Sequence, residues 1–163
     1  HTVTRRQRQM CIRDSVIIGR QNIEKYKSNL ATVKIKNAIK ESESVISLFD
    51  VKTPNTNTLA TALSGGNQQK FVVGRELEDD PSLLIASQPT RGIDIGAQSL
   101  IWEKLRESRD NGLAVLLISA DLEELIGLSD RIIVFYQGSM VKELNSANLS
   151  PEDLGGYMTG LKK

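Results

Sequence analysis

Short apolar runs alternate with helix-forming segments from Leu83 onward, and this alternation constrains the fold more than any other feature of the sequence. Residues 83–86, 114–118 and 131–136 have the composition of buried strands, and the segments between them are expected to be helical. Strands that alternate with helices predict a parallel α/β sheet. The third strand is expected to turn at Gln137-Gly138 into a hairpin with residues 140–144.

A serine followed by two glycines precedes a polar helix-forming run over residues 67–78. This order places the hydroxyl of Ser64 and bare backbone N–H groups at the N-terminus of a helix, which is a favourable site for an anion. Glycine at positions 65 and 66 would let the backbone approach a phosphate closely. An ordinary serine N-cap before a glycine-rich turn would give the same pattern, so these residues alone do not decide between the two interpretations.

The longer stretch Leu63-Ser64-Gly65-Gly66-Asn67-Gln68-Gln69-Lys70 resembles the signature loop of ATP-binding cassette (ABC) ATPases. Its ending is similar to the variant found in importers of simple sugars and nucleosides. The resemblance implies that the chain takes part in binding ATP and Mg²⁺ in an assembled complex. It assigns nucleotide-binding roles to Ser64, Gly65, Gly66, Asn67, Gln68 and Asp94.

The strand at 83–86 resembles the Walker B strand of that family, and the residues after it match the family pattern at Pro89, Thr90, Gly92 and Asp94. Ser87 stands where the family has the Asp that helps to hold Mg²⁺. Gln88 stands where the family has the catalytic Glu that polarises the attacking water. Glutamine cannot take up a proton, and a neutral serine is a poor ligand for a hard cation. We therefore expect no intact catalytic residue and no metal ligand at these positions.

Ala120 is a third departure from the family pattern. After the strand at 114–118 the family usually has Ser-His-Asp, in which the His contacts the γ-phosphate, whereas this chain has Ser119-Ala120-Asp121. His1 is the sole histidine of the sequence, so no other histidine can take that role. Ala120 is also a good helix former beside Asp121, a plausible N-cap for residues 122–128, and both interpretations can hold together.

Composition excludes several other classes of protein. The 163 residues are 39% hydrophobic and 25% charged, which is typical of a globular domain, and no apolar stretch is long enough to span a bilayer. One Cys and one His exclude an internal disulfide framework and a Cys/His metal site. Aromatic residues make up 4% of the chain without an interleaved basic face, so we expect no nucleic-acid partner.

Residues 1–15 have no hydrophobic periodicity and resemble one reading frame of the transposon end used to tag DNA sequencing libraries. We interpret them as a sequencing-adapter artefact and expect them to be disordered. The alternative is a basic N-terminal arm that binds phosphate or membrane. Without these residues, which include four Arg and one Asp, the formal net charge changes from +1 to −2.

No Gly-x-x-x-x-Gly-Lys-Ser/Thr motif occurs, so the P-loop that cradles phosphates is absent from the sequence. The expected fold is a truncated α/β, P-loop NTPase-type parallel sheet with part of the helical signature subdomain. Residues 16–78 would form the helical subdomain with the signature loop, and residues 79–163 the C-terminal α/β core. By resemblance, the chain is the C-terminal part of a second nucleotide-binding domain.

The resemblance implies the ATP-binding subunit of an ABC importer for nucleosides or simple sugars, in which ATP hydrolysis drives import. The expected partners are a second nucleotide-binding domain, expected on the same polypeptide of the full-length protein, membrane permease subunits and, indirectly, a solute-binding protein. The expected location is the cytoplasmic face of a bacterial-type cell membrane, and the isolated fragment is expected to be inactive. Two alternatives stay open: a fragment of a soluble ABC ATPase of translation or DNA repair, and a non-enzymatic interaction half that depends on a partner.

Overall fold

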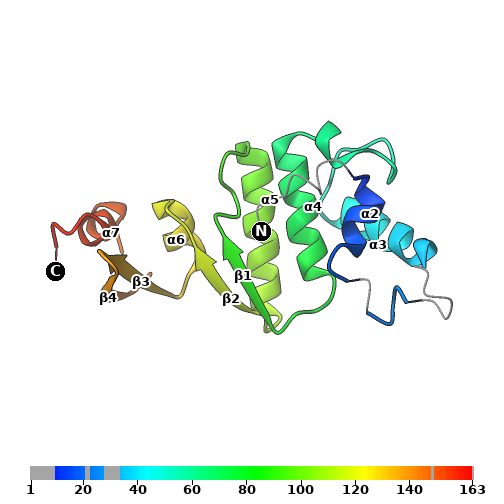
Figure 1. Cartoon of the computed structure of the whole chain (residues 1–163). Helices are drawn as coiled ribbons and strands as arrows, with labels where there is room; N and C mark the ends of the chain where they lie inside the picture. The colour runs from blue at the N-terminus through cyan, green and yellow to red at the C-terminus, as the bar shows by residue number, and fades with distance from the viewer. Residues whose placement is uncertain (1–9, 21–22, 28–33, 148, 163) are drawn as a thin grey trace.

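The computed structural model describes residues 10–20, 23–27, 34–147 and 149–162. Four strands, six α-helices and one short 3₁₀ helix (η1) make up this part of the chain (Figure 1). In chain order they are α2 (Ile12–Ile17), α3 (Ile35–Leu48), η1 (Ala60–Ala62), α4 (Gly65–Leu77), β1 (Leu83–Ser87), α5 (Ile95–Asp110), β2 (Ala114–Ile118), α6 (Leu122–Leu128), β3 (Arg131–Tyr136), β4 (Ser139–Asn145) and α7 (Pro151–Met158).

Helices α2, α3, α4 and α5 share one apolar core. Its fully buried members include Val16 of α2, Val45 of α3 and Ile101 of α5, and Phe71 of α4 is almost fully buried beside them. Gly74 lets α4 lie close to α3, because a Cβ at this position would come within 2.6–2.9 Å of Phe49 and Val45. The core therefore contains residues from both sides of position 78, the boundary that the sequence suggested between two parts.

Residues 10–15 depart from the expectation that the first fifteen residues are disordered. Helix α2 begins at Ile12, whose side chain is fully buried, and the carbonyl of Ser15 accepts a hydrogen bond from Arg75 Nη1 at 3.0 Å. Burying a large aliphatic side chain removes it from water, which favours the ordered state here despite the missing periodicity in the sequence. Residues 1–9 lie outside the described residues, and the adapter interpretation stays a prediction.

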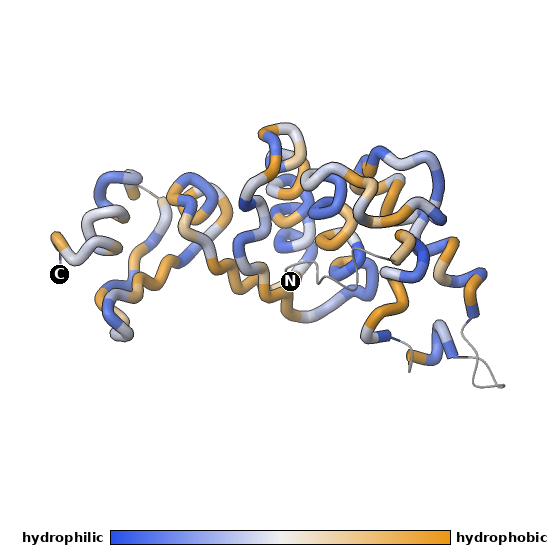
Figure 2. The backbone as a smooth tube through the Cα atoms, turned by 45° about the horizontal axis from the view of Figure 1, so that its top comes forward, coloured by the Kyte–Doolittle hydropathy of each residue, from blue (hydrophilic) through white to orange (hydrophobic). Residues whose placement is uncertain are grey.

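Strands β1 and β2 form the expected parallel pair, with Leu83 opposite Ala114 and Ser87 opposite Ile118. Helix α5 lies beside this pair (Figure 1). Leu83, Ile85, Leu116 and Ile118 lie at alternate positions on one face of the pair. Their relative exposures are 50–56%, so this face is about half exposed. Figure 2 shows the apolar character of both strands. The expectation of buried strands is thus wrong for this face, because no described element covers it.

Strand β3 pairs with β4 in an antiparallel hairpin and not with the parallel pair. Gln137 and Gly138 form its turn, both with positive φ (48° and 78°). The inner face of β3 packs against α7 through Ile132, Val134 and Leu154. The expectation that residues 131–136 form another buried strand of the parallel sheet is therefore wrong, although the α/β class is confirmed.

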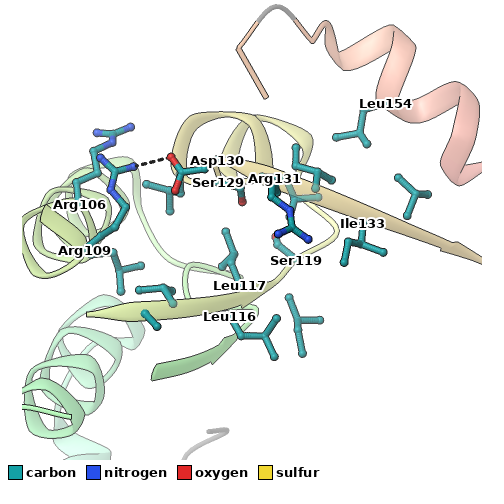
Figure 3. A pocket seen from close by; sticks show the side chains of 18 of the residues that line it. Arg106, Arg109, Leu116, Leu117, Ser119, Ser129, Asp130, Arg131, Ile133 and Leu154 are labelled. Carbon is teal, nitrogen blue, oxygen red and sulfur yellow. Dashed lines mark ion pairs between the residues drawn. The ribbon is translucent and has the colours of Figure 1, made fainter. Parts of the chain in front are cut away.

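A cavity of about 740 Å³ lies between β2 and β3 and is lined mostly by aliphatic side chains (Figure 3). Leu116 and Leu117 of β2 line it from one side, and Ile133 of β3 lines it from the other. Arg109 Nη1 and Asp130 Oδ1 lie 3.8 Å apart among the lining residues. The cavity thus separates β2 from β3, which belong to two different sheets.

Candidate nucleotide site

Ser64 is the N-cap of the 13-residue helix α4. Its Oγ accepts hydrogen bonds from the backbone N–H of Asn67 at 3.3 Å and from Asn67 Nδ2 at 3.0 Å. Because the oxygen accepts in both of these hydrogen bonds, its own hydroxyl proton can be donated to an outside acceptor. Ser64 is exposed, so such an acceptor can reach it. The serine is thus an N-cap and a potential donor at the same time.

The side chains of Asn67 and Gln68 make hydrogen bonds inside the chain. Asn67 Oδ1 accepts from the backbone N–H of Lys52 at 2.9 Å, and Gln68 Nε2 donates to the carbonyl of Leu63 at 2.8 Å. These bonds fix the loop before α4 on both sides of Ser64. Both residues therefore shape the loop, and their assignment as nucleotide-binding residues stays a prediction.

The two glycines of the loop lie in different surroundings. A Cβ on Gly65 would find its nearest neighbour, the carbonyl oxygen of Gly92, at 4.0 Å, so this position is open. A Cβ on Gly66 would lie 2.6 Å from Asp94 Oδ2 and 3.0 Å from the Cβ of Ala97. Gly65 can admit a ligand close to the backbone, whereas Gly66 lets α4 lie against the start of α5.

Asp94, at the start of α5, contacts the loop at residues 64–66. It is the N-cap of α5, because its Oδ1 accepts from the backbone N–H of Ala97 at 2.9 Å, while its Oδ2 faces Gly66. The first-turn N–H groups of a helix have no intrahelical acceptor and carry partial positive charge. The structure therefore brings together four of the residues that the sequence predicted to bind nucleotide: Ser64, Gly65, Gly66 and Asp94.

Ser87 and Gln88 lie at the carboxyl end of β1. Gln88 has a positive φ of 51°, and its backbone N–H donates to the carbonyl of Ile118 at 2.7 Å. A left-handed conformation costs a non-glycine residue about 1 kcal/mol, so the surrounding turn must hold it. The carbonyl of Gln88 in turn accepts from the N–H of Arg91 at 3.3 Å, which closes this turn.

Ala120 follows β2 at the same edge of the parallel pair, because Ser87 lies opposite Ile118. It is exposed, and the loop around it is held by Ser119 Oγ, which accepts from the N–H of Asp121 at 3.0 Å. Asp121 is the N-cap of α6, as the sequence predicted. The methyl group of Ala120 can neither donate to nor accept from a phosphate.

The residues at this edge do not fit a Mg²⁺ ion. Ser87 offers one neutral hydroxyl and Gln88 one amide oxygen, whereas hard cations prefer several carboxylate and carbonyl oxygens. Within the described ranges, no group of three or more His, Cys, Asp or Glu side chains could hold a metal ion. The side chains of Ser87 and Gln88 therefore do not form a metal site at this edge.

A buried polar cluster lies at the other end of α4, and no local sequence pattern indicates it. Arg20 Nη2 donates to the carbonyl of Arg75 at 2.7 Å, and Arg20 Nη1 lies 3.1 Å from Glu41 Oε1. Tyr26 donates its hydroxyl to Glu41, and burial together with this carboxylate raises the pKa of Tyr26 well above its usual value. The cluster fixes α4 against α3 and the chain after α2, and so holds the helix that carries the signature loop.

Comparison with solved structures defines the class of the fold. The chain superimposes on MJ1267, an ATP-binding cassette of an ABC transporter, with a TM-score of 0.72 and 17% identity over 98% of this chain and 63% of that chain. It also superimposes on a putative metal-chelate type ABC transporter with a TM-score of 0.74 and 17% identity, covering 93% of this chain and 59% of that chain. The fold is therefore that of an ATP-binding cassette. No protein-family model matches the chain.

Sequence comparison with curated proteins then narrows the class. The chain is 50% identical over 121 residues to the guanosine import ATP-binding protein NupO of Bacillus subtilis, which covers 74% of this chain and 24% of NupO. It is 38% identical over 136 residues to the ribose import ATP-binding protein RbsA of Clostridium tetani, covering 83% of this chain and 27% of RbsA. The chain thus spans about a quarter of the length of these relatives. It is homologous to the ATP-binding proteins of ABC importers for sugars and nucleosides, as the signature loop indicated.

Proposed function

We propose that this chain is part of the ATP-binding subunit of an importer for nucleosides or simple sugars, in which ATP hydrolysis drives transport. The observation that carries the proposal is the exposed hydroxyl of Ser64 at the N-terminus of α4, beside the open position of Gly65 and the carboxylate of Asp94. The 50% identity with a guanosine import protein supports a nucleoside as the solute. The ribose relative supports the wider class of simple sugars.

The signature loop would complete an ATP site that is built mainly by a second nucleotide-binding domain. ATP supplies the γ-phosphate whose cleavage drives the transport cycle. Ser64 would donate its hydroxyl proton to an oxygen of that phosphate, and the first-turn N–H groups of α4 would face the same charge. Donors that are fixed before the reaction stabilise developing negative charge without a cost of reorganisation. Gln68 and Asn67 would hold these donors in place through their bonds to Leu63 and Lys52.

The chain's own half of the second ATP site would hydrolyse poorly. Gln88 cannot act as a base, Ser87 is a weak metal ligand, and Ala120 lacks a donor for the γ-phosphate. The positive φ of Gln88 places its side chain in a turn that is closed by backbone hydrogen bonds. This half would bind nucleotide and take part in dimer closure, while the partner site carries out most of the hydrolysis.

The cavity between β2 and β3 supports the proposal that this chain belongs to a larger nucleotide-binding domain. Its aliphatic lining and the half-exposed Leu116 and Ile118 would suit an apolar strand from the remainder of the domain, which would also supply the P-loop. Such a strand would cover the apolar surface that the described elements leave exposed. It would join β2 and β3 in one continuous parallel sheet.

The proposed partners follow from this role. They are the second nucleotide-binding domain, membrane permease subunits and, through the permease, a solute-binding protein. We place the assembly at the cytoplasmic face of the cell membrane. None of the helices that the structure describes is both long and apolar enough to cross a bilayer.

A chimera tests the proposal. The 121-residue segment of NupO that aligns with this chain would be replaced by the corresponding residues of this chain, and the assembled transporter would be assayed for guanosine uptake and ATP hydrolysis. The proposal predicts that the chimera transports guanosine and that Ser64→Ala lowers both activities by about a hundredfold. A chimera that folds but does not hydrolyse ATP would contradict the proposal. It would favour the alternative of a non-enzymatic interaction half.

The isolated chain is the control for this assay. Since its sequence contains no P-loop, we expect neither tight binding of a fluorescent ATP analogue nor Mg-ATPase activity from the purified 163 residues. ATP hydrolysis by the isolated chain that is lost on substitution of its own residues would contradict this expectation.

A further inference from the structure

We propose that Glu124 is a positioning residue that couples the loop at 119–121 to the turn at 88–94. The inference rests on the proposed function, because the turn would begin in the chain's own half-site at Gln88 and end beside the partner's site at Asp94. The loop with Ala120 belongs to the chain's own half-site. The turn ends at Asp94, which contacts the signature loop offered to the partner's site.

Glu124 is a buried acidic residue with two hydrogen-bond donors on one oxygen. Glu124 is 1% exposed. Its Oε1 accepts hydrogen bonds from Thr90 Oγ1 at 2.6 Å and from Trp102 Nε1 at 3.1 Å. Thr90 comes from the turn after β1, Trp102 from α5 and Glu124 from α6. One oxygen atom therefore joins three segments that are distant in the sequence.

Glu124 is also bonded directly to the loop that contains Ala120. Its backbone N–H donates to Asp121 Oδ1 at 3.0 Å, and the N–H of Asp121 donates to Ser119 Oγ at 3.0 Å. A displacement of the loop would therefore shift the first turn of α6. Arg106 of α5, which lies over the ring of Trp102 and donates to the carbonyl of Gly127 at 3.2 Å, holds α6 against α5.

The turn on the other side of Glu124 leads to the signature loop. Thr90 is buried between Gln88, whose backbone is bonded to β2, and Asp94, whose carboxylate faces the Cα of Gly66. Because Gly66 leaves no room for a Cβ, a movement of Asp94 is transmitted to α4. The path thus runs from the Ala120 loop through Glu124 and Thr90 to the signature loop.

A purely structural contact at this place would not need a carboxyl group. Burying a polar group is costly unless its partners are placed accurately, and an apolar side chain of similar size would usually stabilise a core as well. A buried acceptor with donors from two segments instead fixes one relative arrangement of those segments. Coupling between two sites requires such a fixed arrangement of the segments that connect them.

Amide hydrogen exchange on the full 163-residue chain tests the coupling without nucleotide. Thr90→Val removes the hydroxyl donor at nearly constant shape, and Thr90→Ser keeps it as the matched control. We expect Thr90→Val to speed exchange of the N–H groups of Gln88 and Glu124 by about tenfold, since a hydrogen bond to such a group contributes that order of stability. The N–H of Leu154 in α7 should change less than about twofold, and Thr90→Ser should behave as the unsubstituted chain.

Hydrogen exchange of Glu124 variants is a second, independent test of the coupling. Glu124→Gln keeps Oε1 as an acceptor for both donors and should preserve slow exchange, whereas Glu124→Met removes the acceptor and should speed exchange at Gln88 and Asp121 together. Faster exchange on one side alone, or an equal increase that includes Leu154, would overturn the coupling.

The NupO chimera gives the functional readout. Thr90→Val should lower kcat for ATP about tenfold and leave KM within about twofold, because the donors at Ser64 and Gly65 are unchanged. Thr90→Ser should restore kcat, and a raised KM with normal kcat would overturn the inference. If the unsubstituted chimera is inactive, the proposed function fails, while the exchange experiment still decides the coupling.

Discussion

Gly66 offers the sharpest test of how the signature loop is built, because its neighbour Gly65 is a natural control. Both residues are in the first turn of α4, and neither has a positive φ. A Cβ on Gly66 would overlap Asp94 Oδ2 at 2.6 Å and the Cβ of Ala97 at 3.0 Å, whereas a Cβ on Gly65 has 4.0 Å of room. Alanine at the two positions therefore separates helix propensity from packing.

The expected change in stability of Gly66→Ala follows from the atoms that the new Cβ would displace. Asp94 cannot turn away freely, because its Oδ1 caps α5 through Ala97 N, and the loss of an N-cap costs about 1 kcal/mol. Displacing Ala97 adds about 1 kcal/mol of overpacking. Replacing glycine in a helix returns about 0.5–1 kcal/mol. We therefore expect Gly66→Ala to lose about 1 kcal/mol and Gly65→Ala to gain up to about 1 kcal/mol.

Thermal and urea unfolding of the full chain measure this difference. A separation of about 2 kcal/mol corresponds to roughly 4–8 °C between the midpoints of the two variants for a protein of this size. Equal stability of Gly66→Ala and Gly65→Ala would refute the close contact between α4 and the start of α5. It would also remove the structural link from Asp94 to the signature loop.

Three further predictions concern stability and use urea unfolding of the full chain. Ile12→Ala should cost about 2–4 kcal/mol because the side chain is fully buried, and an unchanged midpoint would support the view that residues 1–15 do not pack. Gly74→Ala should cost about 2 kcal/mol, since the new Cβ meets the ring of Phe49 at 2.6 Å, and a stabilised variant would contradict the close approach of α3 and α4. Gln137→Asn should stabilise the chain by about 0.5 kcal/mol, because asparagine suits the first position of a turn with positive φ at both central residues, and a loss of stability would contradict that turn.

Local patterns of the sequence predicted most elements of the fold. The strands expected at 83–86, 114–118 and 131–136 are present, although the last does not join the parallel pair, and the Gln137-Gly138 hairpin and the helix caps at Ser64 and Asp121 are confirmed. These features depend on residues close in sequence, such as an N-cap side chain and the N–H group three residues later. Asp94, which the sequence marked for nucleotide binding, is also the N-cap of α5.

Features that depend on distant contacts could not be predicted. The separation of β3 from the parallel pair depends on what fills the space beside β2, and no local pattern encodes it. The burial of Ile12 and Glu124 likewise depends on neighbours 34 or more residues away, such as Thr58 for Ile12 and Thr90 for Glu124. The left-handed backbone of Gln88 follows from its bond to β2, since glutamine has no intrinsic preference for that conformation.

The central claim is that this chain acts through its signature loop and not through its own Walker B position. ATP hydrolysis by the NupO chimera that carries Gly65→Asp or Gln88→Ala tests it most directly. Gly65→Asp would place a negative charge at the open position beside Ser64 and should lower turnover by about a hundredfold or more. Gln88→Ala should leave turnover nearly unchanged, because that half-site is already weak. A loss in Gln88→Ala as large as that in Gly65→Asp would contradict the account and give Gln88 a direct part in hydrolysis.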